Sequence, residues 1–197
     1  MTNHSALSTQ QLSARFEEAL VFTTRLHASQ LRKGTQIPYV AHLLAVASIV
    51  LENGGTEDEA IAALLHDAVE DQGGSKTREE IRRRFGGNVA AIVDGCSDTD
   101  QFIKPPWRKR KEDYIAHLPQ APAAVRLVSL ADKLHNARSI LSDYRLSGES
   151  TWDRFKGGKA GTLWYYRSLV ETFRRIETTP LAEELDRVVT EIERLAA

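Results

Sequence analysis

Glycine pairs and helical periodicity constrain this chain more than any other feature of its sequence. The pairs lie at 54–55, 73–74, 86–87 and 157–158, and glycine commonly ends a helix. Between them, apolar residues recur at intervals of three and four, the period of one helix face, and no segment has a convincing strand pattern. We therefore expect an all-α fold, a single compact helical bundle with short loops.

Apolar spacing and capping residues predict the individual helices. They cover residues 15–30, 38–51, 56–73, 77–86, 88–93, 108–117, 123–144, 163–176 and 179–195. Two of them begin with a capping box, in which a threonine caps the amide three residues on and a glutamate reaches back. These boxes pair Thr56 with Glu59 and Thr77 with Glu80. Residues 97–106, which include two adjacent prolines, are expected to form a loop.

Length and composition limit the class of protein. The 197 residues suffice for one self-sufficient core, and we expect a loose N-terminal segment over 1–12 and a single domain over 13–197. A net charge of −1 argues against a nucleic-acid partner or a polybasic membrane anchor. The only cysteine, Cys96, excludes an internal disulfide. The most apolar stretch, 43–51, is too short to cross a bilayer, and no signal-peptide pattern precedes it, so we expect a cytoplasmic location.

The segment 66–71 concentrates one imidazole and three carboxylates within two turns of a predicted helix. His66 and Glu70 are four residues apart, and Asp67 and Asp71 likewise, so each pair shares a helix face. Three neighbouring carboxylates repel one another unless a cation intervenes, and a buried carboxylate needs a partner. A divalent ion bound by His66 and Asp67 would meet that need. Glu70 and Asp71 would then lie within reach of a water on the ion.

Two further polar residues lie on apolar helical segments. They are His42 and Asp132, and their convergence with the 66–71 segment favours a metal site over a chance dipeptide. The rival interpretation is a helical binding module in which these residues form a structural ion-pair network, without a stoichiometric metal. The other histidines that the pattern leaves over, His27, His117 and His135, are interpreted as structural or exposed.

Together these motifs resemble the HD superfamily of metal-dependent phosphohydrolases, and most closely the stand-alone small alarmone hydrolases of the RelA/SpoT type. The segments that carry the resemblance are 32–42 (RKGTQIPYVAH), 66–71 (HDAVED), 130–136 (LADKLHN) and 163–166 (LWYY). The match covers about residues 16–176. It implies an HD-type hydrolase domain, and we expect no alarmone synthesis from this chain.

The resemblance also implies a metal and its ligands. The family's ligands map to His42, His66, Asp67 and Asp132. Two imidazoles and two carboxylates suit Mn²⁺, although Zn²⁺, Fe²⁺ or Co²⁺ would also bind such a set. Four protein ligands on an octahedral ion leave one position for a water and one for a phosphate oxygen of the substrate.

The roles of the two remaining acidic residues follow from the same resemblance. Glu70 is the candidate that orients or deprotonates the attacking water, and Asp71 would support it by a hydrogen bond or carry the proton. Which of the two is the base stays open.

The family's substrates are nucleotides with a 3′-pyrophosphate, chiefly guanosine tetra- and pentaphosphate, which are hydrolysed to GDP or GTP and pyrophosphate. The resemblance implies that Arg32 and Lys33 bind this polyanion, and that Arg32 also stacks on the base. Asn136 would bind the sugar or phosphate, and Tyr165 is the aromatic residue expected to approach the nucleotide.

Several alternatives remain open at this point. Residues 35–37 (TQI) replace the Ser-Gly-Glu of the long enzymes, so adenosine alarmones of the (p)ppApp type and the 2′-phosphate of NADPH are credible substrates. Another HD nucleotide phosphohydrolase would share the metal ligands. The basic run Lys104–Lys111 is interpreted mainly as a solvated helix start, with a lid over the pyrophosphate as the alternative. The sequence leaves the oligomeric state open.

Overall fold

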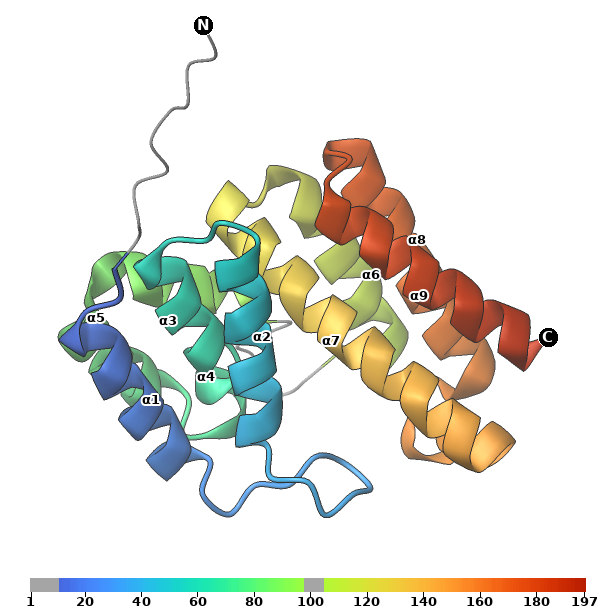
Figure 1. Cartoon of the computed structure of the whole chain (residues 1–197), viewed down its shortest axis with the longest axis horizontal. Helices are drawn as coiled ribbons and strands as arrows, with labels where there is room; N and C mark the ends of the chain where they lie inside the picture. Colours follow the sequence, from blue (N-terminus) through green and yellow to red (C-terminus); the bar gives the residue numbers. More distant parts are fainter. Residues whose placement is uncertain (1–10, 98–104) are drawn as a thin grey trace, which may run out of the picture.

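The computed structural model describes residues 11–97 and 105–197, and helices dominate both stretches (Figure 1). The α-helices are α1 (Ala14–Leu26), α2 (Val40–Glu52), α3 (Glu57–Leu65), α4 (Ala68–Asp71), α5 (Ser75–Cys96), α6 (Trp107–His117), α7 (Ala123–Ser147), α8 (Gly158–Ile176) and α9 (Pro180–Ala196). Two 3₁₀ segments, η1 (Leu118–Gln120) and η2 (Gly148–Arg154), flank α7. No strand occurs within the described ranges, so the prediction of an all-α fold is confirmed.

The long helix α7 organises the molecule. It lies between a group formed by α2, α3 and α5 and a pair formed by α8 and α9 (Figure 1). Helix α1 packs on α3 at the outer side of the first group, and α6 contacts α8. Because α7 contacts both groups, a polar residue on it can meet residues that come from distant parts of the sequence.

The first group owes its core to two unusually apolar helices. Every residue from Ala60 to Leu65 in α3 is fully buried, and so are Leu43, Val46 and Val50 of α2. The Thr56 capping box forms as predicted, with the Thr56 hydroxyl accepting from the Glu59 amide and the Glu59 carboxylate accepting from the Thr56 amide. This cap fixes the start of α3, whose other end carries the polar residues of interest.

One predicted helix is interrupted at the segment that carries chemistry. Instead of running from 56 to 73, the helix ends at Leu65, and a separate short helix, α4, begins at Ala68. His66 and Asp67 occupy the junction. The interruption makes His66 the C-cap of α3 and Asp67 the N-cap of α4.

The second predicted capping box is wrong. Helix α5 begins at Ser75, before Thr77, and its N-cap is Gly74 with a φ of 59°. Thr77 instead donates a short hydrogen bond back to the carbonyl of Gln72, so it ties α5 to the end of α4. Residues 1–10 of the expected loose segment and 98–104 of the expected loop lie outside the described residues.

Candidate metal centre and its cleft

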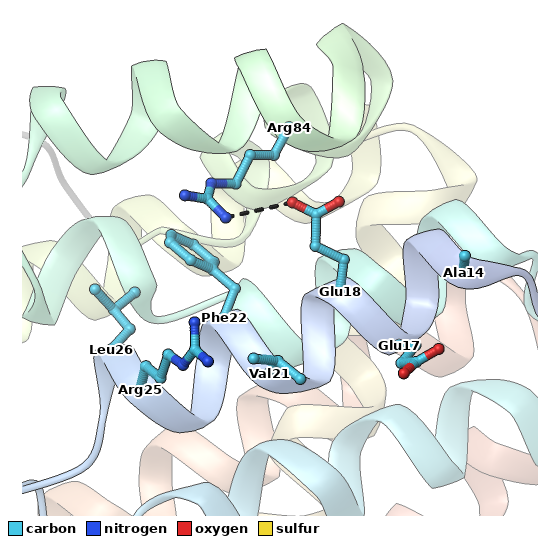
Figure 2. A pocket seen from close by; sticks show the side chains of 8 residues that line it. All are labelled: Ala14, Glu17, Glu18, Val21, Phe22, Arg25, Leu26 and Arg84. Atoms are coloured by element: carbon cyan, nitrogen blue, oxygen red, sulfur yellow. Dashed lines mark hydrogen bonds and ion pairs between the residues drawn. The ribbon is translucent and has the colours of Figure 1, made fainter.

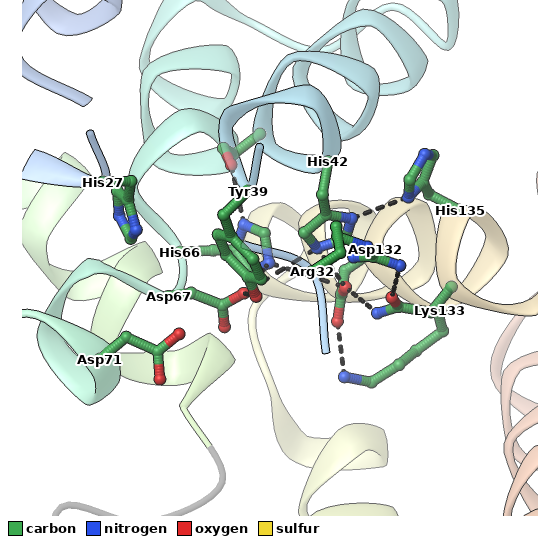
Figure 3. Close-up of polar contacts among 12 residues, drawn as sticks. His27, Arg32, Tyr39, His42, His66, Asp67, Asp71, Asp132, Lys133 and His135 are labelled. Atoms are coloured by element: carbon green, nitrogen blue, oxygen red, sulfur yellow. Dashed lines mark hydrogen bonds and ion pairs between the residues drawn. The ribbon is translucent and has the colours of Figure 1, made fainter. Parts of the chain in front are cut away.

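Four side chains from three regions converge beside α7. His42 comes from the first turn of α2, His66 and Asp67 from the junction between α3 and α4, and Asp132 from the middle of α7. Their imidazoles and carboxylates point toward one another (Figure 3). His42, His66 and Asp132 are buried, whereas the side chain of Asp67 is 27% exposed. The cluster is therefore sealed on one side and open at Asp67.

The distances within this cluster are short enough for His42, His66 and Asp67 to share one ion, and Oδ1 of Asp132 lies beside both imidazoles. The Nε2 atom of His66 lies 3.0 Å from Oδ2 of Asp67 and 3.6 Å from Oδ1 of Asp132. The Nε2 atom of His42 lies 3.2 Å from the same Asp132 oxygen and 3.9 Å from Asp67. Ligand atoms of His42, His66 and Asp67 all lie within 4.8 Å of one another. Two nitrogen and two oxygen donors make a ligand set that divalent transition metals accept.

The hydrogen bonds of the imidazoles support this interpretation. Nδ1 of His66 faces the carbonyl of Ala63 at 2.8 Å, so Nδ1 carries a proton and donates, and Nε2 is the nitrogen that faces the carboxylates of the cluster. The buried Nε2 atoms of His42 and His66 have no hydrogen-bond partner among the described residues. Buried polar atoms normally have one. A metal ion at the centre of the cluster would satisfy both nitrogens.

Electrostatics favour ionised carboxylates in the cluster. Burial alone would raise the pKa of Asp132, but Lys133 and the two imidazoles hold it well below its usual value. Burial likewise opposes ionisation of Asp67, and His66 more than offsets it, so the pKa of Asp67 is lowered. Both side chains thus offer anionic oxygens to a cation.

A second group of residues orients the cluster. Tyr39 donates to Asp67 at 2.5 Å, Lys133 contacts the outer oxygen of Asp132 at 2.6 Å, and Nδ1 of His135 lies 2.7 Å from Nδ1 of His42. The sequence analysis did not single out Tyr39 or Lys133, and it interpreted His135 as structural or exposed. The available signal was their position in the sequence. Lys133 directly follows Asp132, and Tyr39 lies three residues before His42.

Glu70 and Asp71 lie on α4, one turn beyond Asp67, at the open side of the cluster. The Asp71 carboxylate accepts a hydrogen bond from Nε2 of Gln30 at 2.8 Å. Partial withdrawal from water and the charges of Asp67 and Glu70 raise the pKa of Asp71, and the Gln30 contact opposes this shift. The raised pKa suits a group that exchanges protons.

A cleft of about 740 Å³ opens from these two residues and extends toward α6 and α8. Its described lining includes seven cationic and three acidic side chains. The cationic ones are Arg32, Lys33, Arg110, Lys111, Lys133, Arg154 and Lys156; the acidic ones are Glu70, Asp71 and Asp143. Such an excess of positive charge attracts a polyanion.

The residues predicted to bind substrate line this cleft, although their roles stay predictions. Arg32 donates to Asn136 at 3.0 Å, and Asn136 donates to Asp132 at 2.5 Å, so a hydrogen-bonded chain links the cationic wall to the cluster. Lys33 and Tyr165 also line the cleft. The neighbouring Tyr166, which the sequence analysis did not select, does so as well.

The basic run divides between surface and cleft. Lys109 pairs with Asp113 on the surface of α6, and Arg108 stacks 3.2 Å from the ring centre of Trp164. Arg110 and Lys111 line the cleft. Lys104 lies outside the described residues. The helix-start interpretation therefore fits Arg108 and Lys109, and two of their neighbours contribute to the cleft wall.

A second hollow lies against α1 and α5 and contains none of the predicted site residues (Figure 2). Arg84 spans it, pairing with Glu18 at 3.3 Å and lying 4.8 Å from the ring centre of Phe22. Its wall combines apolar side chains with opposite charges that already pair. It offers no group of metal ligands, in contrast to the cleft beside α7.

The profile of the HD domain family matches residues 19–155. The chain belongs to the HD domain family. All four candidate ligands of this HD domain fall inside the matched range. Among curated relatives, guanosine-3′,5′-bis(diphosphate) 3′-pyrophosphohydrolase MESH1 of Xenopus tropicalis is 41% identical over 126 residues, which are 62% of this chain and 68% of the relative. The human protein of the same name is 36% identical over 131 residues, 65% and 70% of the two chains.

A solved structure extends the similarity to nearly the whole HD-domain chain. It is described as a metazoan ortholog of SpoT that hydrolyzes ppGpp and plays a role in starvation responses, and it covers 95% of this chain and 99% of its own, with a TM-score of 0.77 and 27% identity. Within the described residues, no helix is both long and apolar enough to span a bilayer.

Proposed function

We propose that this chain hydrolyses the 3′-pyrophosphate of guanosine alarmones of the (p)ppGpp type, releasing GDP or GTP and pyrophosphate. The observation that carries the proposal is that Glu70 and Asp71 line one cationic cleft together with Tyr39, Lys133 and Asn136, which hydrogen-bond to Asp67 and Asp132 of the His–Asp cluster. The curated relatives carry the name of this activity.

The metal in this proposal is Mn²⁺, held by His42, His66, Asp67 and Asp132. When bound, such an ion acidifies a water molecule and withdraws charge from a phosphate. The two carboxylate donors are what favours Mn²⁺ in this proposal, whereas the two imidazole donors suit Zn²⁺ and Fe²⁺ as well.

Glu70 and Asp71 supply the proton chemistry. Glu70 orients the attacking water and accepts its proton, and Asp71 supports Glu70 or carries the proton onward. The water oxygen forms a bond to the phosphorus attached to the ribose 3′-oxygen. The bond between that phosphorus and the 3′-oxygen breaks, the 3′-oxygen takes up a proton, and pyrophosphate leaves.

The cleft binds the rest of the nucleotide in this account. Arg32 and Lys33 hold phosphate oxygens, Asn136 binds the sugar or phosphate, and Tyr165 packs near the nucleoside. Seven cationic against three acidic side chains leave the cleft with an excess of positive charge, which favours a polyphosphate over a monophosphate.

Other expectations from the sequence stay predictions. They are the division into a loose segment over 1–12 and one HD-type domain over 13–197, the cytoplasmic location, and the absence of nucleic-acid and membrane partners. The metal and the substrate are the parts that one assay can test directly.

The test is incubation of the purified protein with guanosine tetraphosphate and with its adenosine counterpart, each with Mn²⁺ and with EDTA. Release of pyrophosphate and GDP that requires Mn²⁺ supports the proposal. Faster turnover of the adenosine nucleotide would move the substrate assignment to adenine, and turnover of neither nucleotide by metal-loaded protein would contradict it.

A further inference from the structure

The environment of Asp71 assigns a role to a residue that the motifs do not include. Gln30 lies in the loop between α1 and α2, and its Nε2 atom donates to Oδ2 of Asp71 at 2.8 Å. Two other groups contact the oxygen of the same amide. Nδ1 of His27 lies 2.6 Å from Oε1 of Gln30, and Nε2 of Gln72 donates to this oxygen at 2.6 Å.

These contacts permit one orientation of the Gln30 amide. A side-chain amide has one acceptor oxygen and one donor nitrogen. The carboxylate of Asp71 only accepts hydrogen bonds, so the nitrogen of the amide faces Asp71 and the oxygen faces His27 and Gln72. The reversed amide would bring its oxygen against the Asp71 carboxylate and its NH₂ group against the donor of Gln72.

The partner His27 is itself held in one state. It is 2% exposed and stacks on Tyr39, with ring centres 5.6 Å apart. Because Gln30 presents an oxygen, Nδ1 of His27 carries the proton and donates. The Nε2 atom is buried without a hydrogen-bond partner among the described residues, so the contact of Nδ1 with Gln30 is the hydrogen bond that orients the ring.

The backbone of Gln30 is anchored as firmly as its side chain. Its amide donates to the carbonyl of His27 at 3.0 Å, and its carbonyl accepts from the amide of Tyr39 at 2.8 Å. The bridge between Leu31 and Pro38 closes the loop just beyond it. Gln30 therefore approaches Asp71 from a rigid frame.

We propose that Gln30 is a positioning residue for hydrolysis: its amide, oriented by His27 and Gln72, holds the carboxylate of Asp71 in the orientation that serves the attacking water. The inference rests on the proposed function, in which Asp71 supports or relays the proton transfer. Gln30 is not part of the described cleft lining, and its side chain bonds to His27, Asp71 and Gln72, so it acts through Asp71.

The test is a double-mutant cycle of wild type, Gln30→Met, Asp71→Asn and the double variant. For each protein we measure kcat and KM for guanosine tetraphosphate, the Mn²⁺ stoichiometry and Tm. Met has the length of Gln without its donor. We expect Gln30→Met to lower kcat about ten- to a hundredfold, the usual effect of removing a residue that orients a site group, with KM and bound metal unchanged. In the Asp71→Asn background the same change should alter kcat by less than about twofold.

Equal fractional losses in both backgrounds, or wild-type kcat in Gln30→Met, would overturn the inference. If Gln30→Met does not fold, Gln30→Glu keeps the size and places an oxygen against Asp71, so the same loss of kcat is expected. Gln72→Met is a weaker test of the same arrangement, because Gln72 orients the Gln30 amide without contacting Asp71, and we expect a smaller loss of kcat.

Failure of the proposed function would show differently. A wild-type protein inactive on guanosine tetraphosphate would contradict the substrate assignment, and the cycle would then be measured on p-nitrophenyl phosphate. The same non-additivity there would support the role of Gln30, and a protein inert towards both substrates would overturn both proposals.

Discussion

At the scale of single residues, the site separates groups that hold an ion from groups that handle protons. His66 is fixed by the Ala63 carbonyl so that Nε2 faces the cluster. Glu70 and Asp71 lie one turn away on a separate helix. This separation allows the proton-handling residues to be changed without removing a ligand.

Glu70→Gln tests that separation. The variant keeps the size of the side chain but cannot accept the proton of the attacking water, so kcat should fall by roughly 10²- to 10⁴-fold. Bound Mn²⁺ should stay at the wild-type stoichiometry. Glu79→Gln on the exposed surface of α5 is the matched control. A variant that loses metal together with activity would place Glu70 among the ligands.

Some residues of the site could be predicted from the sequence, and others could not. His42, His66, Asp67 and Asp132 were predicted as one set, and the structure brings their side chains together. His135 and Gln30 were not selected, because their importance comes from a hydrogen bond to a residue on another element. Spacing along one helix carries no information about such a contact.

At the scale of elements, local signals predicted helices better than they predicted helix ends. The Thr56 capping box formed, whereas the similar box at Thr77 did not, because Thr77 bonds to the carbonyl of Gln72 instead. The break at His66 has no glycine or proline to signal it. Both differences arise where α3, α4 and α5 must turn around the site, and tertiary contacts there override local preference.

The contact between α6 and α8 depends on a glycine. A Cβ atom at Gly157 would lie 2.6 Å from the ring of Trp107, which itself lines the cleft. Gly157→Ala should therefore cost about 1–3 kcal/mol of stability by overpacking, and KM should rise as α6 moves. A Cβ at Gly87 would meet nothing within 4 Å, so Gly87→Ala should stabilise by about 0.4–1 kcal/mol. Urea unfolding measures both, and equal effects would contradict this packing account.

The C-terminal end of α5 gives a prediction about pH. Burial raises the pKa of the Cys96 thiol from 9.0 to about 11. Between these values the unfolded chain releases a proton that the folded chain keeps, so rising pH favours unfolding. The stability contributed by the neutral thiol is present below pH 9 and lost toward pH 11. We measure the free energy of unfolding in urea as a function of pH. Between pH 9 and pH 11 it should fall less for Cys96→Ala than for wild type, and an equal fall in both proteins would contradict the raised pKa.

At the scale of the whole molecule, the site exists only in the complete fold. The cluster joins α2, the junction between α3 and α4, and α7, and the far wall of the cleft adds α6, α8 and η2. The bundle and the ligand set could be predicted because motifs and periodicity are local. Arg154 and Lys156 on the far wall could not, since no motif marks them and only the packing of α7 against η2 brings them near.

The central claim is that one ion held by His42, His66, Asp67 and Asp132 is required for hydrolysis in the cleft. Titration of metal-free protein with Mn²⁺, with bound metal and pyrophosphate release from guanosine tetraphosphate followed in the same samples, tests it most directly. The account predicts that binding and turnover rise together and saturate at about one ion per chain. Full turnover by the metal-free protein, or a bound ion without any turnover, would contradict it.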